Sequence, residues 1–123
     1  AAWSQHGYGV SQQLVNTTVE LLLSEEAVAG RLGKYVRPSA EAANAAGLPF
    51  VVGETNSVNM GGKVGVSDTA ASALWAFDWV ARIAALNVTR VNFHGDAGCA
   101  YSWLGGFRDG GRASPGVRPG YYG

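Results

Sequence analysis

Three segments of the chain carry short apolar or aromatic runs of strand length, at residues 1–9, 49–54 and 88–95. The first is aromatic and interrupted by glycine, and it predicts a strand end that runs into a loop. The second, "PFVVGE", is apolar without alternation, so it predicts a strand buried on both faces. The third, "VTRVNFHG", predicts another short strand. Each of the three ends at polar or aromatic side chains.

The segment between the first two strands has the signals of a helix. Ser24 is a predicted N-cap, because two glutamates follow it and acidic side chains are favourable in the first turn of a helix. Pro38 either interrupts this helix or begins its second part. Gly47 follows the alanine-rich stretch "SAEAANAA" and is the residue expected just past the C-terminus of the helix.

A second helix is predicted over "TAASALWAFDWVARIAALN", with Ser67 and Asp68 as its capping residues. Its predicted apolar stripe consists of residues that recur at helical spacing, namely Leu74, Phe77, Val80, Ala81 and Ala84. Trp75 and Trp79 are interpreted as packing residues rather than as platforms for sugars. From Gly95 the composition shifts to glycine, arginine and proline, which predicts a long loop, and Trp103 in it either stacks on a sugar or packs locally.

The order strand, helix, strand, helix, strand predicts an α/β fold with a parallel sheet and right-handed crossovers. In doubly wound sheets and in eight-stranded barrels, functional groups gather at the C-terminal ends of the strands. A complete (β/α)8 barrel needs about 200 residues or more. The 123 residues with three predicted strands therefore correspond to less than half of such a barrel.

Composition and charge exclude several classes of function. Nine basic and nine acidic residues cancel, and no block of like charge indicates a nucleic-acid partner. The single Cys99 permits neither an internal disulfide nor a cysteine-based metal cage, and we expect no metal and no cofactor. No apolar run approaches the roughly 20 residues of a transmembrane helix. Asn16 and Asn87 each begin a sequon that would accept an N-glycan in a secreted protein.

The strongest candidate for chemistry is Glu54, which follows a buried strand and precedes the glycine-rich segment 59–65. A partly desolvated carboxylate suits the role of acid, base or nucleophile, but Glu54 could equally cap the following loop or helix. In a retaining glycosidase a second carboxylate lies about 5 to 5.5 Å away. No other acidic residue has a suitable predicted position. His94, after the third strand, is either a structural histidine or a site residue.

The run "GETNSVNMGGKVGVSDTAASALWAFDWVARIAALNVTRVNFHG" resembles glycoside hydrolase family 79, which holds heparanases and microbial and fungal β-glucuronidases. The match continues back through "EAANAAGLPFV" and forward through "AYS" to "PGYYG", and so covers most of the chain from about Ser24. Members of the family carry a (β/α)8 barrel and a β-sandwich domain, and they hydrolyse glucuronides with retention of configuration. The resemblance implies that residues 1–123 are a C-terminal fragment of the barrel, about strands six to eight, without any β-sandwich domain.

The resemblance also implies roles for individual residues. Glu54 matches the catalytic nucleophile, and the acid/base glutamate would lie upstream of Ala1. Tyr8 would hydrogen-bond the nucleophile or the reacting ring, and the loop 59–62 would hold the substrate carboxylate. The implied substrate-binding residues are Tyr8, Asn59, Gly61, Gly62, His94 and Tyr101, with His6 and Asn56 as further candidates.

Two functional hypotheses follow. In the first, the chain supplies the nucleophile and part of the uronic-acid subsite of a retaining, β-glucuronidase-like glycoside hydrolase, and is inactive alone. That enzyme would be secreted through a signal upstream of this segment and would act on glycans or glycoconjugates that contain uronic acids. In the second, the chain is a non-catalytic α/β module that binds acidic sugars through the glycine loop, His94 and Tyr101.

Overall fold

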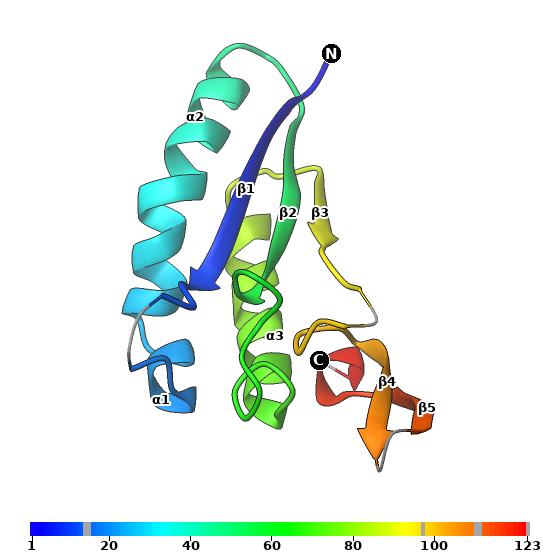
Figure 1. The fold of residues 1–123 in the computed structure, drawn as a ribbon. Helices are drawn as coiled ribbons and strands as arrows, with labels where there is room; N and C mark the ends of the chain where they lie inside the picture. Colours follow the sequence, from blue (N-terminus) through cyan, green and yellow to red (C-terminus); the bar gives the residue numbers. More distant parts are fainter. Residues whose placement is uncertain (14–15, 97, 110–111, 123) are drawn as a thin grey trace.

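The computed structural model describes residues 1–13, 16–96, 98–109 and 112–122 (Figure 1). Its centre is a parallel sheet with the strand order β1-β2-β3. The bounds of these strands are Trp3–Val10 for β1, Phe50–Val58 for β2 and Arg90–Phe93 for β3. The predicted α/β class and the parallel sheet are confirmed, and the assignment of the sheet to a (β/α)8 barrel stays a prediction.

The region between β1 and β2 is helical in several pieces. Thr18 caps the first piece through its side-chain oxygen, and Ser24 accepts a hydrogen bond from the Ala27 amide before the next. Pro38 lies in the first turn of the last piece and so begins it rather than interrupting it, and Gly47 follows its end with a φ of +66°. The pieces are α1 (Val19–Leu22), the π-helical η1 (Glu26–Gly30) and η2 (Leu32–Val36), and α2 (Arg37–Ala45).

The helix α3 (Ala70–Ala84) connects β2 to β3, but it buries a different face from the predicted one. Trp75, Trp79 and Ile83 are buried, whereas the predicted stripe lies exposed at Leu74 and Phe77 and, further along, at Val80, Ala81 and Ala84. Apolar residues occupy both faces of the helix, so periodicity alone could not select one. The large indole rings remove more apolar area from water than leucine does, which decides the choice.

The capping prediction for α3 was also wrong, because its N-cap is Thr69. The Asp68 carboxylate instead accepts a hydrogen bond from the Gly65 amide at 2.6 Å, and Ser67 accepts one from the Lys63 amide at 3.0 Å. Both side chains therefore stabilise the turn before the helix. The interpretation of the tryptophans as packing residues is confirmed by their burial.

We expected one long loop after Gly95, but this segment contains an antiparallel hairpin and a short 3-10 helix. The two strands were not predicted because they contain glycine and proline, which are unfavourable in central strands. Trp103, before the hairpin, packs on Phe93 with 4.5 Å between ring centroids, so it packs locally in this structure. The elements are β4 (Leu104–Asp109), β5 (Arg112–Val117) and η3 (Pro119–Tyr122).

One apolar cluster joins the helices to one face of the sheet. Successive residues of a strand point to opposite faces, and on β1 the helix-facing positions include two glycines. A Cβ built on Gly7 would lie 2.8 Å from Val36 Cγ2, and one built on Gly9 would lie 2.6 Å from Trp75 Nε1. These glycines therefore let the helices approach β1 closely.

No helix in the described part of the chain is long and apolar enough to cross a bilayer.

We predict that Gly9→Ala lowers the free energy of unfolding by about 2 kcal/mol, because the new methyl group collides with Trp75 Nε1 and the Ser57 carbonyl. The control is Gly33→Ala in η2, where an added Cβ meets no heavy atom within 4 Å. Alanine is the better helix former, so this control should match or exceed the parent by up to about 1 kcal/mol. Urea unfolding of both variants would measure the difference, and equal stabilities would contradict the packing argument.

Candidate functional site

The candidate site lies on the face of the sheet that the helices leave open. Gly7 and Gly9 face the helices, so His6 and Tyr8, which alternate with them along β1, point to the opposite face. Residues paired across neighbouring strands point to the same side, and His6 pairs with Glu54. The carboxylate therefore projects from the open face, beside the two β1 side chains.

A bulge in β2 is what turns Glu54 to this face. Gln5 pairs with Val52 and His6 pairs with Glu54, so Gly53 is an extra residue on β2. Val52 belongs to the buried core under the helices, and a regular strand would point Glu54 the same way. A Cβ on Gly53 would meet Ser4 Oγ, which would have to rotate away. The prediction that Glu54 lies at the end of its strand was wrong, because β2 continues to Val58.

Three side chains surround the carboxylate. The Tyr8 hydroxyl donates a hydrogen bond to Glu54 Oε1 at 2.5 Å. His94 Nδ1 lies 3.7 Å from the same oxygen, and His6 Nδ1 lies 3.8 Å from Oε2. The Glu54 side chain keeps a third of its surface exposed. The carboxylate is thus held in one orientation while it stays accessible to a ligand, which is the arrangement that a nucleophile or a general base requires.

Tyr8 is protonated in this arrangement and therefore donates its hydrogen bond to Glu54. Burial, and then the hydrogen bond to Glu54, raise the pKa of the Tyr8 phenol well above its usual value of about 10. The phenol therefore stays protonated throughout the neutral range. A neutral donor orients the carboxylate without neutralising its charge.

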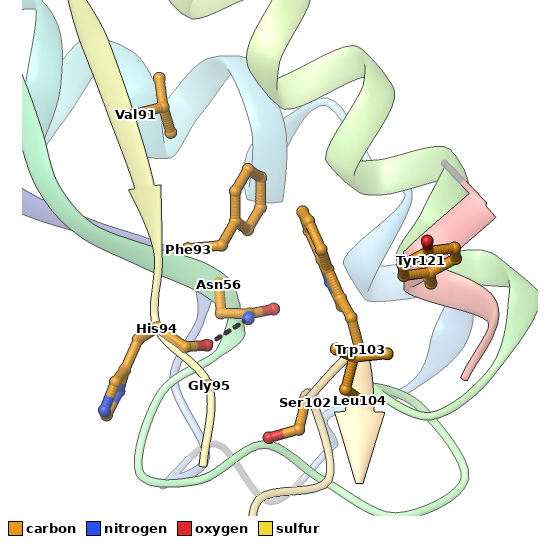
Figure 2. A pocket seen from close by; sticks show the side chains of 9 residues that line it. All are labelled: Asn56, Val91, Phe93, His94, Gly95, Ser102, Trp103, Leu104 and Tyr121. Atoms are coloured by element: carbon orange, nitrogen blue, oxygen red, sulfur yellow. Dashed lines mark hydrogen bonds between the residues drawn. The ribbon is translucent and has the colours of Figure 1, made fainter. Parts of the chain in front are cut away.

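His94 and Tyr101 come to the site from the segment that follows β3. The Tyr101 hydroxyl lies 2.8 Å from His94 Nδ1, and the His94 amide donates to the Thr55 carbonyl. Asn56 connects the two residues, because its side-chain amide donates to the His94 carbonyl at 2.8 Å and to the Tyr101 carbonyl at 3.4 Å. Figure 2 shows the first of these bonds, with the His94 ring turned away from the cavity. Asn56 therefore positions both segments through their backbones.

The glycine loop 59–62 packs against the same segment. The Ala100 amide donates to the Gly61 carbonyl at 2.6 Å, and a Cβ on Gly62 would lie 2.8 Å from the Tyr101 nitrogen. Gly61 and Gly62 have φ values of +93° and +84°, which favour glycine. The Asn59 side chain accepts a hydrogen bond from the backbone of Gln12. The loop is therefore held rigidly next to Tyr101.

Gln12 is a residue that sequence reasoning missed. Besides its backbone bond to Asn59, its side-chain amide donates to the Gly62 carbonyl at 3.1 Å. Arg31 was missed in the same way, and its guanidinium donates to the Tyr8 carbonyl at 3.3 Å. Both act on the backbone of the site across long stretches of sequence, and neither belongs to a motif that could have revealed it.

A cavity of about 500 Å³ lies beside this cluster, on the side of the His94 backbone opposite to the imidazole ring (Figure 2). Phe93, Trp103 and Tyr121 line it together with Asn56, whose amide is already used in hydrogen bonds. Among the described residues that line it there is no carboxylate, so the cluster around Glu54 and not this cavity carries the candidate chemistry.

The structure thus brings the predicted residues Glu54, Tyr8, His6, His94 and Tyr101 into one cluster, with the glycine loop and Asn56 next to it. Their assigned roles stay predictions. Among the described residues, no hydrogen bond or ion pair joins a second carboxylate to the cluster. In the same part of the chain, no three potential His, Cys, Asp or Glu metal ligands gather at one place.

Comparisons with known proteins add to this geometry. No family model matches the chain. A β-glucuronidase of Aspergillus niger is 36% identical over 58 residues, which are 46% of this chain and 11% of that protein. The crystal structure of a 4-O-α-L-rhamnosyl-β-D-glucuronidase from Fusarium oxysporum, in complex with Rha-GlcA, is similar with a TM-score of 0.79 and 29% identity. That likeness covers 98% of this chain and 24% of the Fusarium chain.

This chain therefore spans only a small part of the length of both proteins. Its mixed α/β fold, with a small parallel sheet, resembles part of a glucuronidase. The two comparisons agree in supporting a relationship to glucuronidase-like glycoside hydrolases.

We predict that the stability of the chain falls as the pH rises above about 10, and that Tyr8→Phe makes this fall less steep. The folded-state pKa of Tyr8 lies above the unfolded one, so the unfolded chain releases this proton first. The contribution is complete below the unfolded pKa and is lost as the pH rises toward the folded one. Urea unfolding between pH 8 and 11 on a common buffer series would measure the slope.

The control for this experiment is Tyr35→Phe. A hydrogen bond with Lys34, the largest cause, lowers the pKa of Tyr35, so its removal should not reduce the alkaline loss of stability. An unchanged slope in Tyr8→Phe would show that this phenol is not held protonated by the fold.

Proposed function

We propose that this chain forms the nucleophile-bearing part of a retaining glycoside hydrolase that acts on β-linked glucuronides. The observation that carries the proposal is the Tyr8–Glu54 hydrogen bond, which fixes a partly exposed carboxylate on the open face of the sheet. The likeness to two glucuronidases supports the choice of substrate class.

In the proposed mechanism Glu54 attacks the anomeric carbon and the bond to the leaving group breaks, giving a glycosyl ester. Tyr8 donates to Glu54 Oε1, so Oε2 is the oxygen better placed to attack. A second carboxylic acid protonates the leaving oxygen and then activates water to hydrolyse the ester. The cluster holds one carboxylate among the described residues, so we propose that residues outside this chain supply the second.

For the uronic-acid subsite we propose the glycine loop together with His94, which the Tyr101 hydroxyl contacts at 2.8 Å. Backbone N–H groups can hold a carboxylate where the chain approaches the ligand without a side chain in between. The contact between Gly62 and the Tyr101 backbone places the loop next to this aromatic residue. Glucuronide-containing glycans or glycoconjugates are accordingly the proposed partners.

We further propose that the sheet is the sixth to eighth strands of a (β/α)8 barrel in a secreted protein. Three parallel strands in consecutive order, with helices on one face and polar groups on the other, are consistent with one sector of such a barrel. Asn16 and Asn87, which begin the sequons, are both exposed. Export would give them access to glycosylation.

The test is covalent trapping in the polypeptide that carries these residues, with a 2-deoxy-2-fluoro-β-glucuronide that has a good leaving group. We expect the label on Glu54, located by peptide mass spectrometry, because the fluorine slows both formation and hydrolysis of the ester whereas the good leaving group speeds only its formation. Turnover of an aryl β-glucuronide should fall about 10⁴-fold or more in Glu54→Gln.

Glu41→Gln is the matched control, since Glu41 is an exposed acid that pairs with Arg37 at the surface of α2. The 123-residue chain alone should show no turnover. A label on another residue, or full activity of Glu54→Gln, would overturn the proposal. Sugar binding without turnover, retained in Glu54→Gln, would instead support the non-catalytic module.

A further inference from the structure

The buried hydroxyl of Tyr101 determines the state of a neighbouring ring. Tyr101 is 2% exposed, so its O–H proton needs an acceptor inside the protein. Among the described residues, the hydrogen bond that this hydroxyl forms is the one with His94 Nδ1, at 2.8 Å. A ring nitrogen that accepts a proton donor carries no hydrogen itself. The neutral His94 ring must then carry its hydrogen on Nε2.

The other neighbours of Tyr101 do not change this assignment. Tyr8 lies near enough to interact with Tyr101, but its own proton is donated to Glu54. Cys99 is also close, and a thiol is only a weak acceptor. The Gly61 backbone amide interacts with Tyr101 as a donor and can supply no acceptor for its proton. His94 Nδ1 is therefore the favoured acceptor.

The carboxylate alone would favour the opposite tautomer. Glu54 Oε1 lies 3.7 Å from His94 Nδ1 and would attract a proton on that nitrogen. The Tyr101 hydroxyl is closer, and Oε1 already accepts the Tyr8 proton at 2.5 Å. Tyr101 thus competes successfully with Glu54 for His94 Nδ1.

The Nε2 side of the ring is open. The His94 side chain is 45% exposed and points away from the neighbouring cavity (Figure 2). Within the described part of the chain, Nε2 takes part in no hydrogen bond, whereas Nδ1 has Tyr101 and Tyr8 beside it. An N–H group at Nε2 is therefore free to donate to a ligand that lies over Glu54.

We propose that Tyr101 is a positioning residue, which holds His94 as the Nε2–H tautomer so that this N–H donates to a sugar oxygen next to Glu54. The inference deepens the proposed function and rests on it for the identity of the ligand. The tautomer itself rests only on the geometry of Tyr101, His94 and Glu54.

The first experiment measures the tautomer without any substrate. The native protein is labelled with ¹⁵N at histidine, and the ring nitrogens are observed through their coupling to the ring protons. The sequence contains two histidines, so His6→Gln assigns the signals. Titration of the same signals shows the pH at which the His94 ring is neutral. We expect an unprotonated Nδ1 and a protonated Nε2.

In Tyr101→Phe the two nitrogens should exchange these roles, because Nδ1–H then turns to Glu54. Tyr122→Phe removes an exposed hydroxyl and is the matched control, which should leave the signals unchanged. A protonated Nδ1 in the parent protein, or an identical His94 spectrum in Tyr101→Phe, would overturn the proposal. A folded Tyr101→Phe is recognised by unchanged methyl resonances of the core.

The second experiment measures turnover of an aryl β-glucuronide. Tyr101→Phe should lower kcat/KM about tenfold, as expected for loss of one donor to the transition state, whereas Tyr122→Phe should not. An unchanged kcat/KM alongside the exchanged tautomer would overturn the role of Nε2–H in binding. Absence of turnover in the parent protein would overturn the proposed function instead. The NMR measurement would still test the His94 tautomer, because it needs no substrate.

Discussion

Side chains of a strand alternate between the two faces of a sheet, and the candidate site depends on one break in this alternation. The extra residue at Gly53 turns Glu54 away from the core that holds Val52 and toward Tyr8. In a regular strand the carboxylate would be buried under the helices without a partner, which is costly for a charged group. The bulge therefore makes the fold and an accessible carboxylate compatible.

As a result, one face of the sheet packs against the helices and the other carries the candidate site. On the helix side, Gly7 and Gly9 leave room for Trp79 and Trp75, and close packing there holds β1 against the helices. In the described part of the chain, the open side carries the polar side chains and has no helix over it. Because β1 is fixed from behind, the Tyr8 hydroxyl meets Glu54 in a defined geometry. Rigidity in the core thus preorganises the polar cluster.

Backbone hydrogen bonds then bring distant segments to the same place. Asn56 reaches the carbonyls that precede and follow the turn after β3, and Gln12 holds the glycine loop from the end of β1. The residues that these bonds position, His94 and Tyr101, complete the surroundings of the carboxylate. Hydrogen bonds therefore connect three segments that are far apart in the sequence, and a substitution in any of them should change the surroundings of the Glu54 carboxylate.

By itself, the sequence determined the α/β class and the parallel order of strands, which follow from the order of local apolar runs. It also predicted the candidates Glu54, Tyr8, His94 and Tyr101 through its resemblance to a glycosidase family. Only the tertiary structure decided which face of α3 is buried, because both faces are apolar and the space beside Gly9 selects Trp75. It also decided the direction of Glu54 and the hairpin after Gly95. Bulges and strand pairings depend on contacts between distant segments, which local patterns do not contain.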